Sequence, residues 1–174
     1  MQVIKANSTH VNYISDFGSK SFIHAYQSTL PLEALKEYIN VAFSKETILK
    51  EINGSSATYY ICQDSELNLC GYAKLNKSPT PKCVDLDNSI ELQRLYVDSD
   101  YRDKGVGKLL AKHVESIAQD KNMNNIWLNV WEGNTVAQAI YKKWGFKVVG
   151  EELYKVGKEQ RKVLLMCKSL NNIT

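Results

Sequence analysis

The chain has 174 residues, of which 44% are hydrophobic, 10% aromatic and 24% charged. This composition is typical of a globular protein and excludes collagen, coiled-coil and disordered classes. We expect one domain over residues 1–174, because the length suits a single core and no repeat or long linker divides the chain. No apolar run reaches the roughly 20 residues of a membrane span, and the N-terminus lacks an apolar signal segment. We therefore expect a cytoplasmic protein with no membrane partner.

The charge is unevenly divided along the chain. The formal net charge of +3 is too small for a nucleic-acid-binding surface, so we expect no nucleic acid partner. Residues 1–87 carry 8 basic and 9 acidic side chains, whereas residues 88–174 carry 14 basic and 10 acidic ones. The second half thus has a net charge of +4 and holds all three arginines. This surplus indicates an anionic ligand for the second half.

The cysteines and histidines lack the spacing of a metal site or a disulfide framework. No C-x-x-C pair occurs, and the histidines stand alone in the sequence. We expect reduced thiols and no bound metal. The residues concerned are Cys62, Cys70, Cys83 and Cys167, and His10, His24 and His113.

The first part of the chain predicts a strand at 3–5 and helices at 8–26, 32–43 and 45–52. Ser8 or Thr9 suits the N-cap of the first helix, and Ser44 that of the third. Pro31 fits the first turn of the second helix. Gly54 follows the third helix, where we expect it to end the helix in a left-handed conformation.

The remainder predicts strands at 58–63, 69–75, 89–97, 126–131, 146–154 and 162–168, and helices at 105–118 and 135–144. The first two and the last two of these strands read as hairpins, whereas the alternation of strand and helix between them predicts parallel neighbours. The segment 76–87 contains Pro79 and Pro81 and is predicted to be a loop. The elements together predict an α/β fold, a mixed sheet of about seven strands with helices on both faces.

A loop that contains two glycines joins the strand at 89–97 to the next helix. Its sequence, Arg102-Asp103-Lys104-Gly105-Val106-Gly107, can aim backbone N–H groups at an anion at the helix N-terminus. A Walker A loop would need Gly at position 102 and Ser or Thr at 109, where the chain has Arg and Leu. A dinucleotide fingerprint would need a third glycine at Leu110. ATP and NAD are therefore disfavoured as ligands.

The loop instead resembles the Arg/Gln-x-x-Gly-x-Gly/Ala signature of the GNAT superfamily of acetyl-CoA-dependent N-acetyltransferases. Downstream, Asn134-x-x-Ala137-x-x-x-Tyr141-x-x-x-Gly145-Phe146 matches the second motif of that superfamily in order and spacing. Within the superfamily, NIWLNVWEGN at 125–134 and AIYKKWGF at 139–146 resemble the PaiA type, which acetylates polyamines such as spermidine. The resemblance covers nearly the whole chain and implies the GNAT fold.

The resemblance implies acetyl-CoA as the co-substrate, whose phosphates are the anion that the charge division indicates. Leu95, Tyr96 and Val97 would bind the pantetheine arm as a neighbouring strand would, and a backbone amide near Tyr96 would polarise the thioester carbonyl. Asn134 is either an N-cap or a pantetheine contact. Lys143 either reaches the 3′-phosphate or stays solvated. The resemblance places the pyrophosphate on Arg102, Asp103, Lys104, Gly105, Val106 and Gly107.

Two catalytic roles also follow from the resemblance. Tyr141 would ordinarily be a core residue of its helix, but its position matches the residue that protonates the departing CoA thiolate. Glu91 stands fourteen positions before Gly105, which is the spacing of the general base in the histone acetyltransferase branch. A base is needed because an alkylammonium with a pKa of about 10.4 must lose a proton before it attacks. A strand-edge carboxylate without a catalytic part is the alternative reading of Glu91.

We expect the acceptor to be a small-molecule primary amine, in particular a polyamine such as spermidine or spermine. A protein N-terminus, an amino acid or an aminoglycoside remains open, as do a non-catalytic acyl-CoA-binding regulatory role and a homodimer. Trp127 and Trp131 share one strand face, which we expect a helix to cover. The candidate wall residues are Phe22, Tyr26, Gln27 and Pro31, and the candidate carboxylates are Asp85, Asp87, Glu91 and Glu132.

Overall fold

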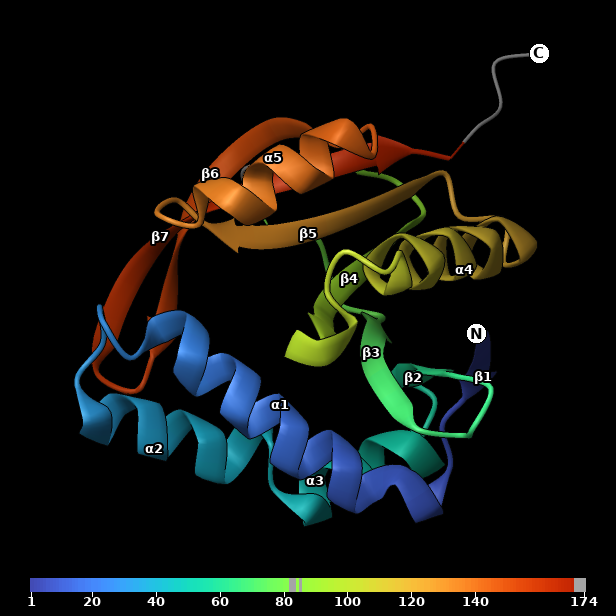
Figure 1. The fold of residues 1–174 in the computed structure, drawn as a ribbon. Coiled ribbons are helices and arrows are strands. Elements are labelled where there is room, and N and C mark those ends of the chain that lie inside the picture. The colour runs from blue at the N-terminus through green and yellow to red at the C-terminus, as the bar shows by residue number, and fades with distance from the viewer. Residues whose placement is uncertain (82–83, 85, 171–174) are drawn as a thin grey trace.

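In the computed structural model, one seven-stranded sheet separates two layers of helices (Figure 1). The structure describes residues 1–81, 84 and 86–170. The strand order is β1-β2-β3-β4-β5-β7-β6; β4 and β5 are parallel, and every other neighbouring pair is antiparallel. The predicted mixed sheet is therefore confirmed. The bounds are β1 Gln2–Lys5, β2 Ala57–Gln63, β3 Leu69–Asn76, β4 Ser89–Val97, β5 Asn125–Trp131, β6 Lys147–Val156 and β7 Glu159–Ser169.

Helices cover both faces of the sheet, as the sequence predicts. Helices α1 and α3 pack on one face around Ile14 and Ile48, and α1 and α2 pack around Phe22 and Leu35. Helices α4 and α5 cover the other face, where Leu110 is fully buried. In the described part of the chain, no helix combines the length and apolarity needed to cross a membrane. The bounds are α1 Val11–Tyr26, α2 Leu32–Ala42, α3 Lys45–Asn53, α4 Val106–Asp120 and α5 Thr135–Lys143.

The structure corrects two expected helix ends. A 3₁₀ turn precedes α1, and Asn7 caps it because its Oδ1 accepts a hydrogen bond from the Thr9 N–H at 3.0 Å. Gly54 has a φ of −91° and is not left-handed, since the chain runs on directly in an extended conformation. Ser44 is confirmed as a cap, because its Oγ accepts from the Thr47 N–H at 3.1 Å.

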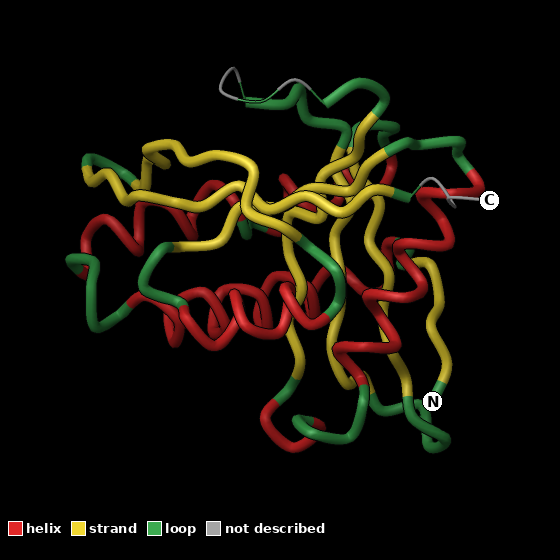
Figure 2. Tube along the Cα trace, turned by 90° about the horizontal axis from the view of Figure 1, so that it is seen from above, coloured by secondary structure: helices red, strands yellow, loops and turns green. Residues whose placement is uncertain are grey.

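Strands β4 and β5 pair over a short stretch and then separate. They are paired from Ser89 with Asn125 to Glu91 with Trp127, and beyond this β4 stays with β3 while β5 stays with β7. Figure 2 shows the result from above, with two groups of strands that run in different directions. The facing edges of β4 and β5 therefore carry backbone groups that no strand pairs.

The β3–β4 register shows which backbone groups face this opening. The N–H of Asp98 donates to the Cys70 carbonyl of β3 at 2.9 Å. Hydrogen-bonded pairs alternate along an antiparallel ladder, so Tyr96 also directs its N–H toward β3. The N–H groups of Leu95 and Val97 consequently face the opening.

A β-bulge at Gln93 changes which side chains share a face of β4. Lys74 lies opposite Arg94, but Leu75 lies opposite Leu92, so Gln93 is an extra residue. Leu92 and Leu95 both pack in the core beneath α4, although they are three positions apart. Glu91 and Tyr96 meet on the opposite face for the same reason, and the bulge thereby brings them to one pocket.

Candidate active site

A groove of about 1080 Å³ lies at the C-terminal end of β4, beyond the stretch that pairs with β5. This volume matches the upper end of the roughly 300–1,000 Å³ that is usual for ligand sites. Leu95, Tyr96 and Val97 of β4 line it, together with the loop before α4. The remaining walls come from α1, through Phe17, Lys20, Ser21 and His24, and from α5 and the residue that follows it, through Val136, Ala137, Ile140, Tyr141, Lys143 and Trp144.

The loop before α4 is built for an anion. Gly105, at the N-cap, has a φ of +84°, and a Cβ there would meet no atom within 4 Å. Glycine is therefore required by the backbone angle, and the space above it stays open for a ligand. The first N–H groups of α4 have no acceptors within the helix, and no side chain among the described residues caps the helix. Tyr101 donates to Asp64 Oδ2 at 2.7 Å, which fixes the turn that leads into the loop.

Tyr141 presents a phenol to the same groove. It is half-buried on α5, with its ring edge-on to Trp144 at 5.8 Å and to Phe146 at 5.7 Å between centroids. Burial, with a smaller contribution from Tyr26, raises the pKa of Tyr141 to about 12. The phenol thus keeps its proton at neutral pH and can donate it.

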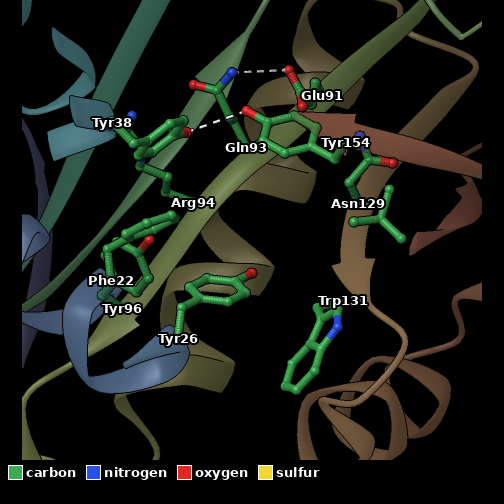
Figure 3. Close-up of a pocket in the computed structure, with 11 residues that line it drawn as sticks. Phe22, Tyr26, Tyr38, Glu91, Gln93, Arg94, Tyr96, Asn129, Trp131 and Tyr154 are labelled. Carbon is green, nitrogen blue, oxygen red and sulfur yellow. Dashed lines mark hydrogen bonds between the residues drawn. The ribbon is translucent and has the colours of Figure 1, made fainter. Parts of the chain in front are cut away.

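A second pocket of about 80 Å³ lies on the α1–α2 side of Tyr96 (Figure 3). The hydroxyls of Tyr38 and Tyr154 are hydrogen-bonded at 3.2 Å, which joins α2 to β6 across it. Phe22 stacks on Tyr38 with ring centroids 4.5 Å apart. Among the described residues, Tyr96 is the one that lines both the groove and the pocket. Aromatic faces dominate the wall: Phe22, Tyr26, Tyr38, Tyr96, Trp131 and Tyr154.

Glu91 is the one acidic residue in the described lining of this pocket. The residue is 6% exposed, and its Oε2 accepts a hydrogen bond from Ser78 Oγ at 2.6 Å. Burial raises the pKa of Glu91, and the hydrogen bonds from Ser78 and Asn76 and the charges of Lys74 and Arg94 oppose this only in part. A carboxylate with a raised pKa is suited to accept a proton.

Arg94 gives the floor of the pocket a fixed positive charge. The residue is 7% exposed; its Nη2 donates to the Ala42 carbonyl at 3.1 Å, and its Cζ lies 3.9 Å from the Phe43 ring centroid. Burial favours the neutral guanidinium, but the surrounding tyrosines outweigh it and the pKa of Arg94 is raised. Lys74, beside it, is paired with Glu51 at 2.7 Å. Glu91 therefore remains the acidic group that the pocket offers to a cation.

A family model described as the acetyltransferase (GNAT) family matches residues 20–146. The chain belongs to this family. Its fold is that of PaiA N-acetyltransferase from Thermoplasma acidophilum, solved in complex with coenzyme A, with a TM-score of 0.76 and 24% identity over 97% of this chain and 98% of that one.

Two sequence relatives support the same assignment. The chain is 26% identical over 151 residues to a spermidine N(1)-acetyltransferase of Thermoplasma acidophilum, which covers 85% of this chain and 89% of the relative. It is 27% identical over 134 residues to an uncharacterized N-acetyltransferase from the pepI 3′ region of Lactobacillus delbrueckii subsp. lactis, which covers 74% and 76%. The protein is an acetyl-CoA-dependent N-acetyltransferase, and its groove and open glycine loop suit the co-substrate.

Of the twelve residues expected to bind acetyl-CoA, ten line the groove: Leu95, Tyr96, Val97, Arg102, Asp103, Gly105, Val106, Gly107, Tyr141 and Lys143. Lys104 and Asn134 do not. Lys104 Nζ lies 5.2 Å from the Tyr101 ring centroid, and Asn134 Oδ1 accepts from the Ala137 N–H at 3.1 Å as the N-cap of α5. Lys20 and Lys108 add positive charge that the sequence did not reveal. Basic residues outnumber acidic ones in the lining, as a polyphosphate requires.

The structure brings together only some of the residues expected to form the acceptor wall. Phe22 and Tyr26 line the pocket, but Gln27 and Pro31 are exposed beyond the end of α1 and do not. Glu132 does not line the pocket, and its Oε2 lies 3.9 Å from Lys162 Nζ. The exposed Asp87 does not line the pocket either. Asp85, like Cys83, lies outside the described residues. Sequence reasoning missed Tyr38, Gln93, Arg94, Asn129, Tyr154 and Val163.

The two tryptophans of β5 have different neighbours. Trp131 lies 6.0 Å from Tyr26 of α1 between ring centroids, so a helix covers it as expected. Trp127 packs instead in a cluster that includes Leu165, with Val84 and Leu86 from the segment before β4. The expectation of a helix over both indoles is wrong for Trp127, because a loop covers that part of the sheet.

The described residues contain no group of three or more His, Cys, Asp or Glu side chains that could hold a metal ion.

Proposed function

We propose that this acetyltransferase transfers the acetyl group of acetyl-CoA to a terminal primary amine of a polyamine such as spermidine. The observation that carries the proposal is the aromatic pocket that contains Glu91 and adjoins the groove at Tyr96. Aromatic faces attract an ammonium group, and a buried carboxylate pairs with it. The name of the 26% identical relative, a spermidine N(1)-acetyltransferase, supports the same acceptor.

The donor lies in the groove with its pyrophosphate on the first N–H groups of α4. Arg102 adds charge there, and Lys143 on α5 reaches toward the 3′-phosphate. The pantetheine arm follows the unpaired edge of β4. Since the N–H groups of Leu95 and Val97 face the opening, one of these two amides polarises the thioester carbonyl and stabilises the oxyanion.

The acceptor enters the second pocket as an ammonium group. Glu91 takes one proton from it and later releases this proton to solvent. The neutral amine attacks the thioester carbon, the C–S bond breaks, and the thiolate takes the phenolic proton of Tyr141. The second proton lost by the acceptor nitrogen restores the phenol. The products are the acetamide, CoA as the thiol and one proton in solution.

The small volume of the pocket suits a slender aminoalkyl end. Because Glu91 is the one described acidic lining residue and Arg94 lies beneath the pocket, the site accommodates a single ammonium group. The other charged nitrogens of a polyamine stay outside it. Residues 1–174 act as one catalytic domain in this proposal; a homodimer and a cytoplasmic location remain predictions.

The test is a thiol-release assay with acetyl-CoA across spermidine, spermine, short monoamines, amino acids, peptides and an aminoglycoside. We expect a polyamine to give the highest kcat/KM, with mass spectrometry locating the acetyl group on a terminal nitrogen. Glu91→Gln should abolish most of this turnover, whereas the exposed Glu132→Gln serves as the matched control. Turnover confined to peptides or amino acids would reject the polyamine, and acetyl-CoA binding without turnover of any acceptor would indicate a regulatory protein.

A further inference from the structure

The carboxylate of Glu91 is held by one oxygen. Its Oε2 accepts hydrogen bonds from Ser78 Oγ at 2.6 Å, and from Asn76 Nδ2 and Gln93 Nε2 at 3.4 Å each. Oε1 accepts none from the part of the chain that the structure describes. Figure 3 shows the Gln93 amide pointing at this carboxylate. The two oxygens of one carboxylate are therefore not equivalent.

The Ser78 hydroxyl has a defined direction. Asn76 Nδ2 donates to Ser78 Oγ at 2.6 Å, so the oxygen of the hydroxyl is occupied as an acceptor. A hydroxyl has a single proton, and this one is left for Glu91 Oε2. Asn76 is also the β3 residue opposite Glu91 in the sheet. The pairing of the two strands therefore holds Asn76, the first donor of this chain of hydrogen bonds, beside Glu91, the last acceptor.

We propose that Ser78 is a positioning residue of the acetyltransferase, which fixes Oε2 of Glu91 and leaves Oε1 to accept the proton of the acceptor ammonium. In this step an N–H bond of the acceptor breaks and an O–H bond forms at Oε1, with the electron pair left on nitrogen. Ser78 touches neither acceptor nor donor. This inference rests on the proposed function, because it assigns the same carboxylate as the base.

The groups that face Glu91 determine whether loss of the Ser78 hydroxyl raises or lowers the pKa of its carboxyl group. They are Ser78 and Asn76 from the β3 side, Lys74 of β3, Arg94 and Gln93 of β4, and Tyr154 of β6. Lys74 Nζ donates to Glu51 and Arg94 Nη2 to the Ala42 carbonyl, and the hydrogen bonds that Glu91 accepts come from Ser78, Asn76 and Gln93. Loss of the Ser78 hydroxyl destabilises the ionised carboxylate and raises the pKa of Glu91 further.

The variants are Ser78→Ala, which removes the hydroxyl, and Ser78→Thr, which keeps it. Thr80→Ala is the matched control, since Thr80 lies in the same loop and its hydroxyl makes no hydrogen bond among the described residues. In Ser78→Ala, the acidic limb of kcat/KM should move up by about one pH unit, so that the loss is about tenfold at pH values below the pKa of Glu91 and disappears well above it. Ser78→Thr and Thr80→Ala should follow the wild-type profile. A loss by the same factor at every pH, or no loss, would overturn the proposal.

A second measurement does not depend on the acceptor. The Glu91 carboxyl is titrated by ¹³C NMR in the protein with labelled glutamate, and Glu91→Gln assigns its signal. Ser78→Ala should move this titration to higher pH, and an unmoved titration contradicts the proposal whatever the substrate. A moved titration with an unmoved pH profile of turnover overturns the role in catalysis. A moved titration in a protein that acetylates no amine rejects the proposed function, but leaves the coupling of Ser78 to Glu91 in place.

Discussion

Replacing Tyr141 by Phe removes one hydroxyl and retains the packing of the ring. The edge-on contacts with Trp144 and Phe146 involve the ring itself, and the hydroxyl has no hydrogen-bond partner within the described residues. We therefore expect little change in stability or in affinity for CoA. The thiolate loses its proton donor, and general acids contribute about 10²–10⁴ in rate. A loss of about 100-fold in kcat corresponds to about 2.7 kcal/mol of transition-state stabilisation.

The assay measures kcat by thiol release and the dissociation constant of CoA by calorimetry. Since the pKa of Tyr141 is about 12, the acid stays protonated across the accessible alkaline range. Tyr141 should therefore give no alkaline limb below pH 10, and the loss in Tyr141→Phe should be constant from neutral pH upward. This pH-independent loss distinguishes the acid from the base Glu91.

A matched control is Tyr60→Phe, because Tyr60 is buried on β2 with its ring centroid 4.9 Å from that of His113, and it lines neither the groove nor the pocket. It should turn over like the wild type. Unchanged kcat in Tyr141→Phe would refute the assignment of the acid. An equal loss in kcat and in CoA affinity would show that the phenol binds the donor and does not serve as a proton donor.

Three further changes test other parts of the site and the fold. Glu91→Gln should lower kcat/KM about 100-fold at pH 7 and less at higher pH, because the fraction of unprotonated acceptor increases about tenfold per pH unit and replaces the need for a base. A ratio of wild-type to variant kcat/KM that stays constant across pH would contradict this. Gly105→Ala should weaken CoA binding in calorimetry and cost about 1 kcal/mol in urea unfolding, since its φ is +84° but its surroundings are open. Gly18→Ala should cost about 1–3 kcal/mol in the same unfolding assay, because its Cβ would collide with the Tyr72 hydroxyl and the Phe43 ring; an unchanged midpoint would disprove the clash.

The donor side of the site could be predicted from the sequence because its determinants are local. A loop with glycine at 105 and 107 before an amphipathic helix specifies an anion site by backbone geometry alone, without reference to distant residues. Tyr141 and Lys143 follow on a helix whose start Asn134 marks. The motif fixed the elements but not the individual contacts: Asn134 caps α5, and Lys104 lies outside the groove.

The candidate acceptor pocket could be predicted only in part, because it is assembled from segments far apart in the chain. Tyr38 and Tyr154 meet across 116 positions, and the 3.6-residue period of α2 gives no partner for Tyr38 on a strand so far along the chain. The same limit explains Gln27 and Pro31. Both follow α1 closely in sequence, but the chain turns away after Tyr26, and only the packing of α2 against β6 shows which side chains remain at the pocket.

The decisive feature that periodicity could not supply is the bulge at Gln93. In a regular strand, Glu91 and Tyr96 have opposite parity and would point to opposite faces of the sheet. Simple alternation would therefore keep the Glu91 carboxylate away from the Tyr96 side chain. The extra residue changes this, because it turns Glu91 and Tyr96 to the pocket while Leu92 and Leu95 remain in the core beneath α4. One inserted position thus places the candidate base on the same side of the sheet as Tyr96, which lines both the groove and the pocket.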